Sequence, residues 1–270
     1  MIMKLVESIL TKNPCYTAGR KITVKGLMLH SVGCPQPKAQ VFIKNWNRSD
    51  YKNACVHGFI DGTDGTIYQT LPWDRRGWHC ASGKKGSGNN THIGVEMCEP
   101  ATIKYTGGST FTDSNPAKTK EVVLRTYQSA VELFAMLCQR YGLDPLQDGV
   151  VISHKEGCAR GIASNHGDPE HLWSKFGLTM DGFRKDVKAA MGDTVTAKPT
   201  TPVASPTASL PRLVKVTATA LNVRSGPGTS HKVNMTIRDQ GTYTIVEEQG
   251  GWGRLKSGAG WISLAYTKNV

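Results

Sequence analysis

Apolar positions divide the first 190 residues into short continuous runs and longer periodic stretches. A spacing of three to four residues between apolar positions predicts helices over 38–47, 116–142 and 171–191. Between these helices, short apolar runs predict buried strands in LMLHS, IGVEMCEP and VVISHKEG. Because strands and helices alternate, we expect an α/β fold in which a mixed central sheet carries flanking helices on both faces.

The pattern changes after residue 191. Residues 192–211 are rich in Pro, Thr, Ser and Ala and lack an apolar period, which predicts an extended linker. Beyond the linker, short strands separated by Gly-rich turns predict a small all-β barrel. We therefore expect an α/β domain over 1–191, a linker over 192–211 and a small β domain over 212–270.

Two of the predicted strands are followed by histidine, at His30 and His154, and Asp168 lies downstream in NHGDPEHLW. Imidazole nitrogen and carboxylate oxygen are good zinc ligands, and catalytic zinc is held by three protein ligands with one open position. Histidines at the ends of neighbouring strands could face the same ion. The pattern predicts a zinc hydrolase, although a histidine in this position is also common as an ordinary core or rim residue.

Other polar residues compete for a role in this site. Glu96 lies in an apolar run, where a carboxylate is disfavoured unless it is paired or used. Cys158 follows His154 by four residues and is the main rival of Asp168 as third ligand, but the glycines around it favour a loop. His171 falls in the first turn of the next predicted helix, and a further histidine, His79, lies in the loop GWHCASG.

Five segments resemble a known family in their order along residues 20 to 190. They are LMLHS, VHGFIDGTDGTIYQTLPWDRRGWHCASG, HIGVEMCEP, ISHKEG and NHGDPEHLW. The ordered set resembles the zinc-dependent N-acetylmuramoyl-L-alanine amidases, which are related to phage lysozyme-type amidases and to animal peptidoglycan recognition proteins. The resemblance implies a domain of mixed α/β fold. It also implies a hydrolase activity that uses Zn²⁺ and acts on bacterial peptidoglycan.

The resemblance also implies roles for individual residues. His30, His154 and Asp168 match the metal ligands of the family, and Glu96 matches a glutamate that acts as general base in some members. His79 would line the substrate groove beside the metal, but a loop histidine beside tryptophan is a packing residue about as often.

Two positions depart from the family pattern. His166 falls where the family usually has a lysine that stabilises the oxyanion, so a permanently charged group is replaced by one that titrates near neutral pH. Val56, before His57, stands where some members place a catalytic tyrosine. Because Glu96 is present, we interpret the chain as a member of the glutamate-using branch.

The segment after the linker resembles the bacterial SH3-like domain through LNVRSGPG and the later GW pairs, over about residues 212 to 270. Such domains bind the cell wall in many lytic enzymes. Trp252, Trp261 and Tyr266 are the candidate wall-binding residues, although tryptophans in so small a barrel are usually core.

Composition narrows the partners and the site of action. The formal net charge of +12 favours an anionic polymer such as a wall polymer, whereas no nucleic-acid motif or basic run interleaved with aromatics appears. Seven cysteines without a CxxC pair favour a reducing compartment. The N-terminal apolar stretch is too short for a signal peptide, and no stretch is long enough to span a membrane. We expect synthesis in the cytoplasm and action on the wall after release.

These observations predict a peptidoglycan hydrolase that cuts the bond between N-acetylmuramic acid and L-alanine, as a phage or prophage endolysin. A bacterial autolysin of the same activity fits the sequence as well. A recognition protein that binds muropeptides without cutting is the alternative from another class, and the retained ligand set argues against it. A papain-like cysteine peptidase would need a cysteine that opens a helix, which the sequence does not offer.

Overall fold

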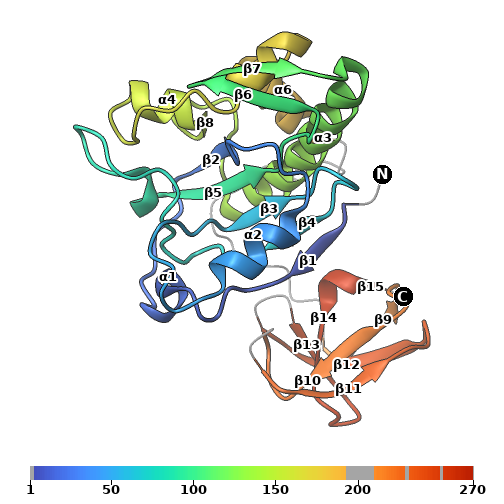
Figure 1. The fold of residues 1–270 in the computed structure, drawn as a ribbon. Coiled ribbons are helices and arrows are strands. Elements are labelled where there is room, and N and C mark those ends of the chain that lie inside the picture. Colours follow the sequence, from blue (N-terminus) through green and yellow to red (C-terminus); the bar gives the residue numbers. More distant parts are fainter. Residues whose placement is uncertain (1–2, 193–209, 229–230, 250–251, 270) are drawn as a thin grey trace. The chain divides into compact units, whose positions relative to one another are not determined.

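The computed structural model describes residues 3–192, 210–228, 231–249 and 252–269 (Figure 1). The chain divides into two compact units, residues 1–198 and 199–270. Most of the predicted linker lies at 193–209, outside the described residues. In the part of the chain that the structure describes, no helix combines the length and apolar character needed to cross a membrane.

The first unit is built on a six-stranded mixed sheet with the order β1-β4-β3-β5-β2-β8. All neighbours in this sheet are parallel except β3 and β4, which are antiparallel. Its strands are β1 (Leu5–Glu7), β2 (Gly26–Ser31), β3 (Gly58–Ile60), β4 (Ile67–Gln69), β5 (His92–Met97) and β8 (Val151–Ser153). The predicted mixed sheet is confirmed, and the three strands predicted from apolar runs, β5, β2 and β8, are adjacent.

Helices cover both faces of this sheet, as predicted. The α-helices are α1 (Pro14–Thr17), α2 (Ala39–Trp46), α3 (Pro116–Tyr141), α4 (His154–Ala159), α5 (Glu170–Trp173) and α6 (Met180–Gly192). Two short 3₁₀ turns, η1 (Gly88–Asn90) and η2 (Ser174–Phe176), and the hairpin of β6 (Ile103–Gly107) and β7 (Thr110–Asp113) complete the unit. The hairpin was not anticipated from the sequence.

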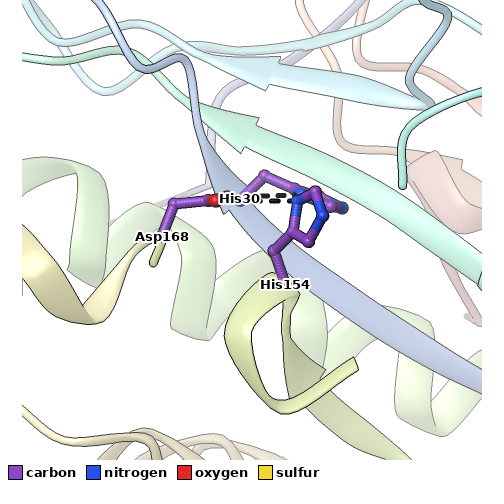
Figure 2. A group of neighbouring side chains, drawn as sticks. All are labelled: His30, His154 and Asp168. Atoms are coloured by element: carbon purple, nitrogen blue, oxygen red, sulfur yellow. Dashed lines mark hydrogen bonds and ion pairs between the residues drawn. The ribbon is translucent and has the colours of Figure 1, made fainter. Parts of the chain in front are cut away.

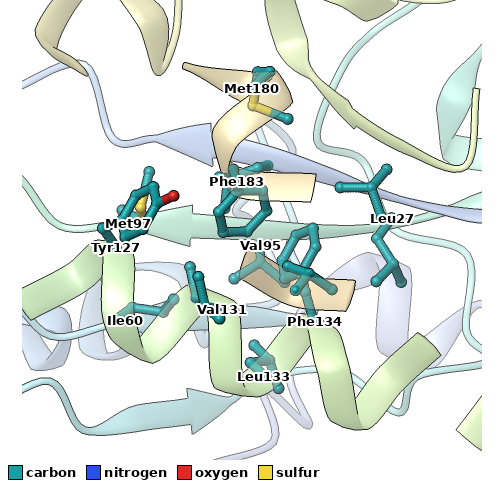
Figure 3. Close-up of a cluster of buried hydrophobic side chains, with 14 of the residues drawn as sticks. Leu27, Ile60, Val95, Met97, Tyr127, Val131, Leu133, Phe134, Met180 and Phe183 are labelled. Carbon is teal, nitrogen blue, oxygen red and sulfur yellow. The ribbon is translucent and has the colours of Figure 1, made fainter. Parts of the chain in front are cut away.

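Strand alternation separates the core from the site. Odd-numbered residues of β2 and β5, such as Leu27 and Val95, pack against α3 and α6 in the main core (Figure 3). Phe134 of α3 and Phe183 of α6 meet there edge to face, with ring centroids 5.2 Å apart. Even-numbered residues of the same strands, including His30, therefore point to the opposite face. That face is only partly covered by α2.

The segment 171–191 does not form the single helix that its apolar spacing predicts. Gly177 adopts a left-handed φ of 70° after η2, and the chain restarts as α6 at Met180. A left-handed residue ends a helix, and glycine tolerates that conformation without a Cβ penalty. The break separates the short α5 from the core helix α6.

The second unit is an antiparallel sheet, seven-stranded in the described residues, with the order β11-β10-β14-β13-β12-β9-β15. Its elements are β9 (Arg212–Val216), β10 (Leu221–Arg224), β11 (Val233–Ile237), β12 (Thr242–Gln249), β13 (Trp252–Leu255), β14 (Trp261–Ser263), η3 (Leu264–Tyr266) and β15 (Thr267–Asn269). Of the candidate wall-binding residues, Trp261 is 8% exposed whereas Tyr266 is 54% exposed. Tyr266 is therefore the most accessible of the three, and Trp252 is partly buried.

Candidate metal centre

The carboxyl ends of β5, β2 and β8 bring three chemically active residues to one place. In the parallel pairing, His30 on β2 lies directly beside Glu96 on β5, and Leu29 lies beside Ser153 at the end of β8. His154 follows Ser153 and so stands next to His30. Three adjacent parallel strands thus deliver two imidazoles and a carboxylate to the same edge and face of the sheet.

His154 is positioned by a helix start rather than by a strand. Its sequence pattern predicts the end of an apolar strand, but β8 stops at Ser153 and His154 is the first residue of α4. Ser153 caps this helix: its hydroxyl accepts from the Glu156 backbone nitrogen, and the Glu156 carboxylate accepts from the Ser153 nitrogen. This capping box fixes the first turn and with it the direction of the His154 ring.

His30, His154 and Asp168 converge on one point (Figure 2). Their ligand atoms lie within 4.8 Å of one another, and all three residues are buried. The two Nδ1 atoms are 3.0 Å apart, and Asp168 oxygens lie 3.4 Å from His30 Nδ1 and 3.6 Å from His154 Nδ1. The three predicted ligands are therefore brought together.

Cys158, the main rival of Asp168, is not part of this cluster. It lies in α4, which is helical there despite Gly157, and its Sγ is 3.9 Å from Asn165 Oδ1. Cys158 lies four residues after His154, and residues with this spacing share one face of a helix. The third residue of the cluster is nevertheless Asp168. The expectation of a loop around Cys158 was wrong, because the capping box at Ser153 starts a helix through the glycine.

The protonation states of the clustered side chains are those needed to bind a metal cation. Burial is the main cause that lowers the pKa of His30, so its imidazole is neutral. Burial alone would raise the pKa of Asp168, but its contacts with the neighbouring histidines outweigh burial and hold the pKa well below its usual range. The Asp168 carboxylate also accepts from the Ser31 backbone nitrogen at 3.3 Å. A neutral imidazole beside a carboxylate anion is the state that metal binding requires.

Glu96 faces the same space with an unused oxygen. Its Oε2 is covered from solvent and has no hydrogen-bond partner among the described residues. Burial, followed by the charges of Asp168 and Glu99, raises its pKa well above the usual value. A carboxyl group that holds a proton unusually well, beside a candidate metal site, is suited to accept and return protons.

A cavity of about 840 Å³ opens over the cluster. Its lining includes the candidate residues Glu96, His154, Asp168, His166 and His79. His166 is exposed; its Nδ1 lies 3.0 Å from Ser164 Oγ, and its ring centroid is 4.5 Å from that of His154. His166 therefore presents a polar edge to the cavity.

His79 lines the cavity and contacts His30 at the nitrogen that does not face His154 and Asp168. It is 9% exposed, and its Nδ1 is 2.9 Å from His30 Nε2. The position where some members of the resembled family have a tyrosine is closed: Val56 and His57 are fully buried. His57 Nε2 donates to the Arg75 carbonyl, and burial lowers the pKa of His57 to about 4.

Comparisons with known proteins agree with this geometry. The model of the N-acetylmuramoyl-L-alanine amidase family matches residues 19–171, which contain every residue of the cluster, and the bacterial SH3 domain model matches residues 219–268. The chain belongs to the N-acetylmuramoyl-L-alanine amidase family. Its second unit is a bacterial SH3 domain.

Individual relatives support the family assignment over part of the chain. Bacillus subtilis CwlH and XlyA, both named N-acetylmuramoyl-L-alanine amidases, are 39% and 49% identical over 80 residues, or 30% of this chain. These segments span 30% of CwlH and 25% of XlyA. The Staphylococcus aureus hydrolase AmiA shares the fold at a TM-score of 0.52 and 22% identity, covering 71% of this chain and 84% of that chain.

The amidase unit also contains a polar network that the sequence did not reveal. Glu99 is 1% exposed and accepts from the Ser31 hydroxyl at 2.7 Å and from the Tyr105 hydroxyl at 2.8 Å. Tyr105 also lies 2.6 Å from His171 Nε2. Because Ser31 bonds both Glu99 and Asp168, the network braces the carboxylate ligand. A second glutamate in the apolar run IGVEMCEP was the signal that could have indicated it.

The donor set of this amidase-family site fits a metal ion. Two imidazole nitrogens and a carboxylate oxygen are ligands of the type that zinc takes in catalytic sites, with a cavity to provide the open position. The nearby Glu96 Oε2 has no hydrogen-bond partner in the described part of the chain and can therefore accept from a molecule bound at the site. His30, His154 and Asp168 are thus the residues able to hold the metal.

Proposed function

We propose that this chain is a zinc-dependent N-acetylmuramoyl-L-alanine amidase, which hydrolyses the amide bond between N-acetylmuramic acid and L-alanine of peptidoglycan. The observation that carries the proposal is the convergence of His30, His154 and Asp168 at a cavity that Glu96 also lines, with Glu96 Oε2 left without a partner among the described residues. Family membership and the names of CwlH and XlyA support the reaction.

Zn²⁺ held by the three ligands would supply a Lewis acid that polarises the scissile carbonyl and makes water a stronger nucleophile at neutral pH. Glu96 takes the proton from the attacking water and returns it to the departing amine of L-alanine. Its raised pKa assists the first step by keeping the transferred proton in place. General acid-base assistance of this kind contributes ~10²–10⁴-fold to the rate.

His166 donates a hydrogen bond to the carbonyl oxygen as negative charge develops on it. Its position at the cavity, anchored by Ser164 and beside the His154 ring, supports this role. One donor to an oxyanion is worth on the order of 10²–10³-fold in rate. In this role, the imidazole of His166 replaces the lysine that the resembled family usually has at this position.

The SH3 domain binds the wall and holds the amidase unit close to its polymeric substrate. Tyr266 is the most exposed of the candidate aromatic residues and is the first choice for this contact. The net charge of +12 adds attraction to anionic wall polymers. Together these features support the role of an endolysin of a phage or prophage; a bacterial autolysin would use the same site.

Two other functions fit the structure less well. A recognition protein without activity would not need the buried Glu96, whose Oε2 has no partner in the described structure, next to a complete ligand set. A cysteine peptidase would need a reactive thiol at the cavity. Cys80 does line the cavity, but burial raises its pKa to about 11, and a thiolate is the reactive form.

The proposal is tested by digesting purified Gram-positive peptidoglycan with the full chain and identifying the new end groups by mass spectrometry. We expect free L-alanine amino termini and intact lactyl-muramic acid, lost on chelation, restored by zinc and absent with Glu96→Gln. Binding to the wall without new ends would support the recognition protein and contradict the proposal. Cleavage within the stem peptide that resists chelation would contradict it as well.

A further inference from the structure

The second ring nitrogen of His30 contacts a further buried histidine, His79. His30 Nε2 lies 2.9 Å from His79 Nδ1, and His79 Nε2 lies 3.1 Å from the backbone carbonyl oxygen of His92. The rings of His30 and His79 meet edge to face, with centroids 5.0 Å apart. The second nitrogen of the ligand His30 is therefore bonded to another imidazole, not to a carboxylate or to solvent.

The chain of contacts determines where the protons lie. A carbonyl oxygen only accepts hydrogen bonds, so His79 Nε2 must carry the proton that points to His92. An imidazole that carries one proton has an acceptor at its other nitrogen, so with the proton on Nε2 the Nδ1 of His79 is the acceptor that faces His30. That nitrogen in turn requires a proton on His30 Nε2. The lone pair of His30 then resides on Nδ1, which faces His154 and Asp168.

The sheet holds the His79 ring in this position. A Cβ at Gly94 of β5 would lie 2.3 Å from His79 Cγ and 2.6 Å from its Nδ1, so the ring occupies the space that a side chain there would fill. The backbone nitrogen of His79 donates to Asn89 Oδ1 at 2.7 Å. Glycine on the strand and an asparagine anchor together fix the ring against His30.

We infer that His79 is a positioning residue that fixes the tautomer of His30, so that Nδ1 of His30 is the nitrogen offered to the metal. The partners of metal-bound histidines commonly set the tautomer and ring direction in this way. The inference deepens the proposed function, because it rests on the proposed metal site. It differs from a role of His79 in binding substrate, which would leave metal affinity unchanged.

Two substitutions separate the hydrogen bond from the volume of the ring. His79→Phe keeps a flat ring but removes the acceptor for His30 Nε2. His79→Gln keeps an acceptor for His30 and a donor for the His92 carbonyl. Trp78→Phe is the matched control, because Trp78 lines the same cavity, is 39% exposed and is not in the metal cluster.

The first readout is the zinc dissociation constant of the folded full chain, measured by competition with a chromogenic chelator without peptidoglycan. We expect about 10–100-fold weaker binding for His79→Phe, recovery of most of the affinity in His79→Gln, and no change in Trp78→Phe. Circular dichroism identifies the variants that keep the native fold. Zinc affinity in His79→Phe equal to that of the native sequence would overturn the inference.

The second readout needs no variant. In long-range ¹H–¹⁵N correlation spectra of the zinc-loaded protein, we expect His30 to bind zinc through Nδ1 with a proton on Nε2. Coordination through Nε2, or a proton on Nδ1 of His79, would overturn the inference. Both readouts are independent of the reaction: a protein that passes them without cleaving peptidoglycan contradicts only the proposed function, whereas an active enzyme that fails them contradicts only this inference.

Discussion

His30 and His154 face the candidate metal site with the same atom but are supported in different ways. Each points Nδ1 at the other, and they are 1% and 6% exposed. The Nε2 of His30 meets the buried His79, 49 residues away in sequence. The Nε2 of His154 lies 3.2 Å from the hydroxyl of Ser164, 10 residues away and at the cavity wall.

The difference separates a ligand held by the sheet from one held by a local turn. His30 belongs to β2, a strand that pairs with β5 on one side and β8 on the other. The ring of its partner His79 packs against Gly94 of β5. His154 depends on the capping box at Ser153 and on a hydroxyl that water from the cavity can replace. We expect the His30 side to keep its geometry without metal and the His154 side to depend on it more.

Removal of either ligand is expected to have the largest effect, in spite of the different supports. His30→Ala and His154→Ala should each lose stoichiometric zinc and reduce wall hydrolysis to background, because two ligands do not make a closed site. Metal analysis by mass spectrometry and turbidity clearing of wall suspensions check this. His231→Ala, in the SH3 domain, is the control. Full zinc occupancy in either ligand variant would contradict the site.

Substitution of Glu96 should separate the proton carrier from both ligands. Glu96→Gln keeps the size of the side chain and touches neither histidine, so zinc binding should remain while kcat falls by ~10²–10⁴-fold. Release of soluble muropeptides measures kcat, and metal analysis confirms occupancy. An unchanged kcat would exclude Glu96 as the general base.

Removal of zinc is expected to destabilise the amidase unit and to loosen one side of the site more than the other. Zinc at 100 times its dissociation constant adds about 2.7 kcal/mol to the free energy of unfolding, about a hundredfold in the equilibrium. Calorimetry with and without chelator measures the shift. Amide exchange should then increase more in α4 and at 164–168 than in β2; equal increases would contradict the contrast between the two ligands.

The support of His154 should contribute least. Ser164→Ala removes the hydroxyl beside His154 Nε2, but Ser164 lines the cavity, where water can take its place. We expect zinc affinity to fall by less than about tenfold, in contrast to the larger loss for His79→Phe. Chelator competition on both variants gives the comparison. A greater loss in Ser164→Ala than in His79→Phe would reverse our interpretation of the two supports.

The sequence predicted the strand-borne part of the site better than the part built by loops. The apolar runs LMLHS and IGVEMCEP were predicted as buried strands, and the structure pairs them with His30 directly beside Glu96. The helix that begins at His154 was missed, since an apolar run gives no direct sign of where a strand ends. The break in the predicted helix 171–191 was missed as well, because the apolar spacing continues across Gly177, whose left-handed φ of 70° ends the first part.

The contacts between distant segments were the least predictable. The hydrogen bond between His30 and His79 joins two segments that are far apart in the sequence. The only features of the sequence that relate to it are Gly94, which leaves space for the ring, and the presence of a histidine in the loop. The Glu99, Tyr105 and His171 network joins a strand end, an unforeseen hairpin and a short helix. Neither periodicity nor residue spacing carries information on such pairings.

The measurement that tests the central claim most directly is a crystal structure of the zinc-loaded chain with anomalous data on both sides of the zinc absorption edge. We predict one strong anomalous peak in the amidase unit, bound by Nδ1 of His30, Nδ1 of His154 and a carboxylate oxygen of Asp168, and open to the cavity beside Glu96. A peak bound by other residues or through Nε2 of His30, or no peak in zinc-loaded crystals, would contradict the account.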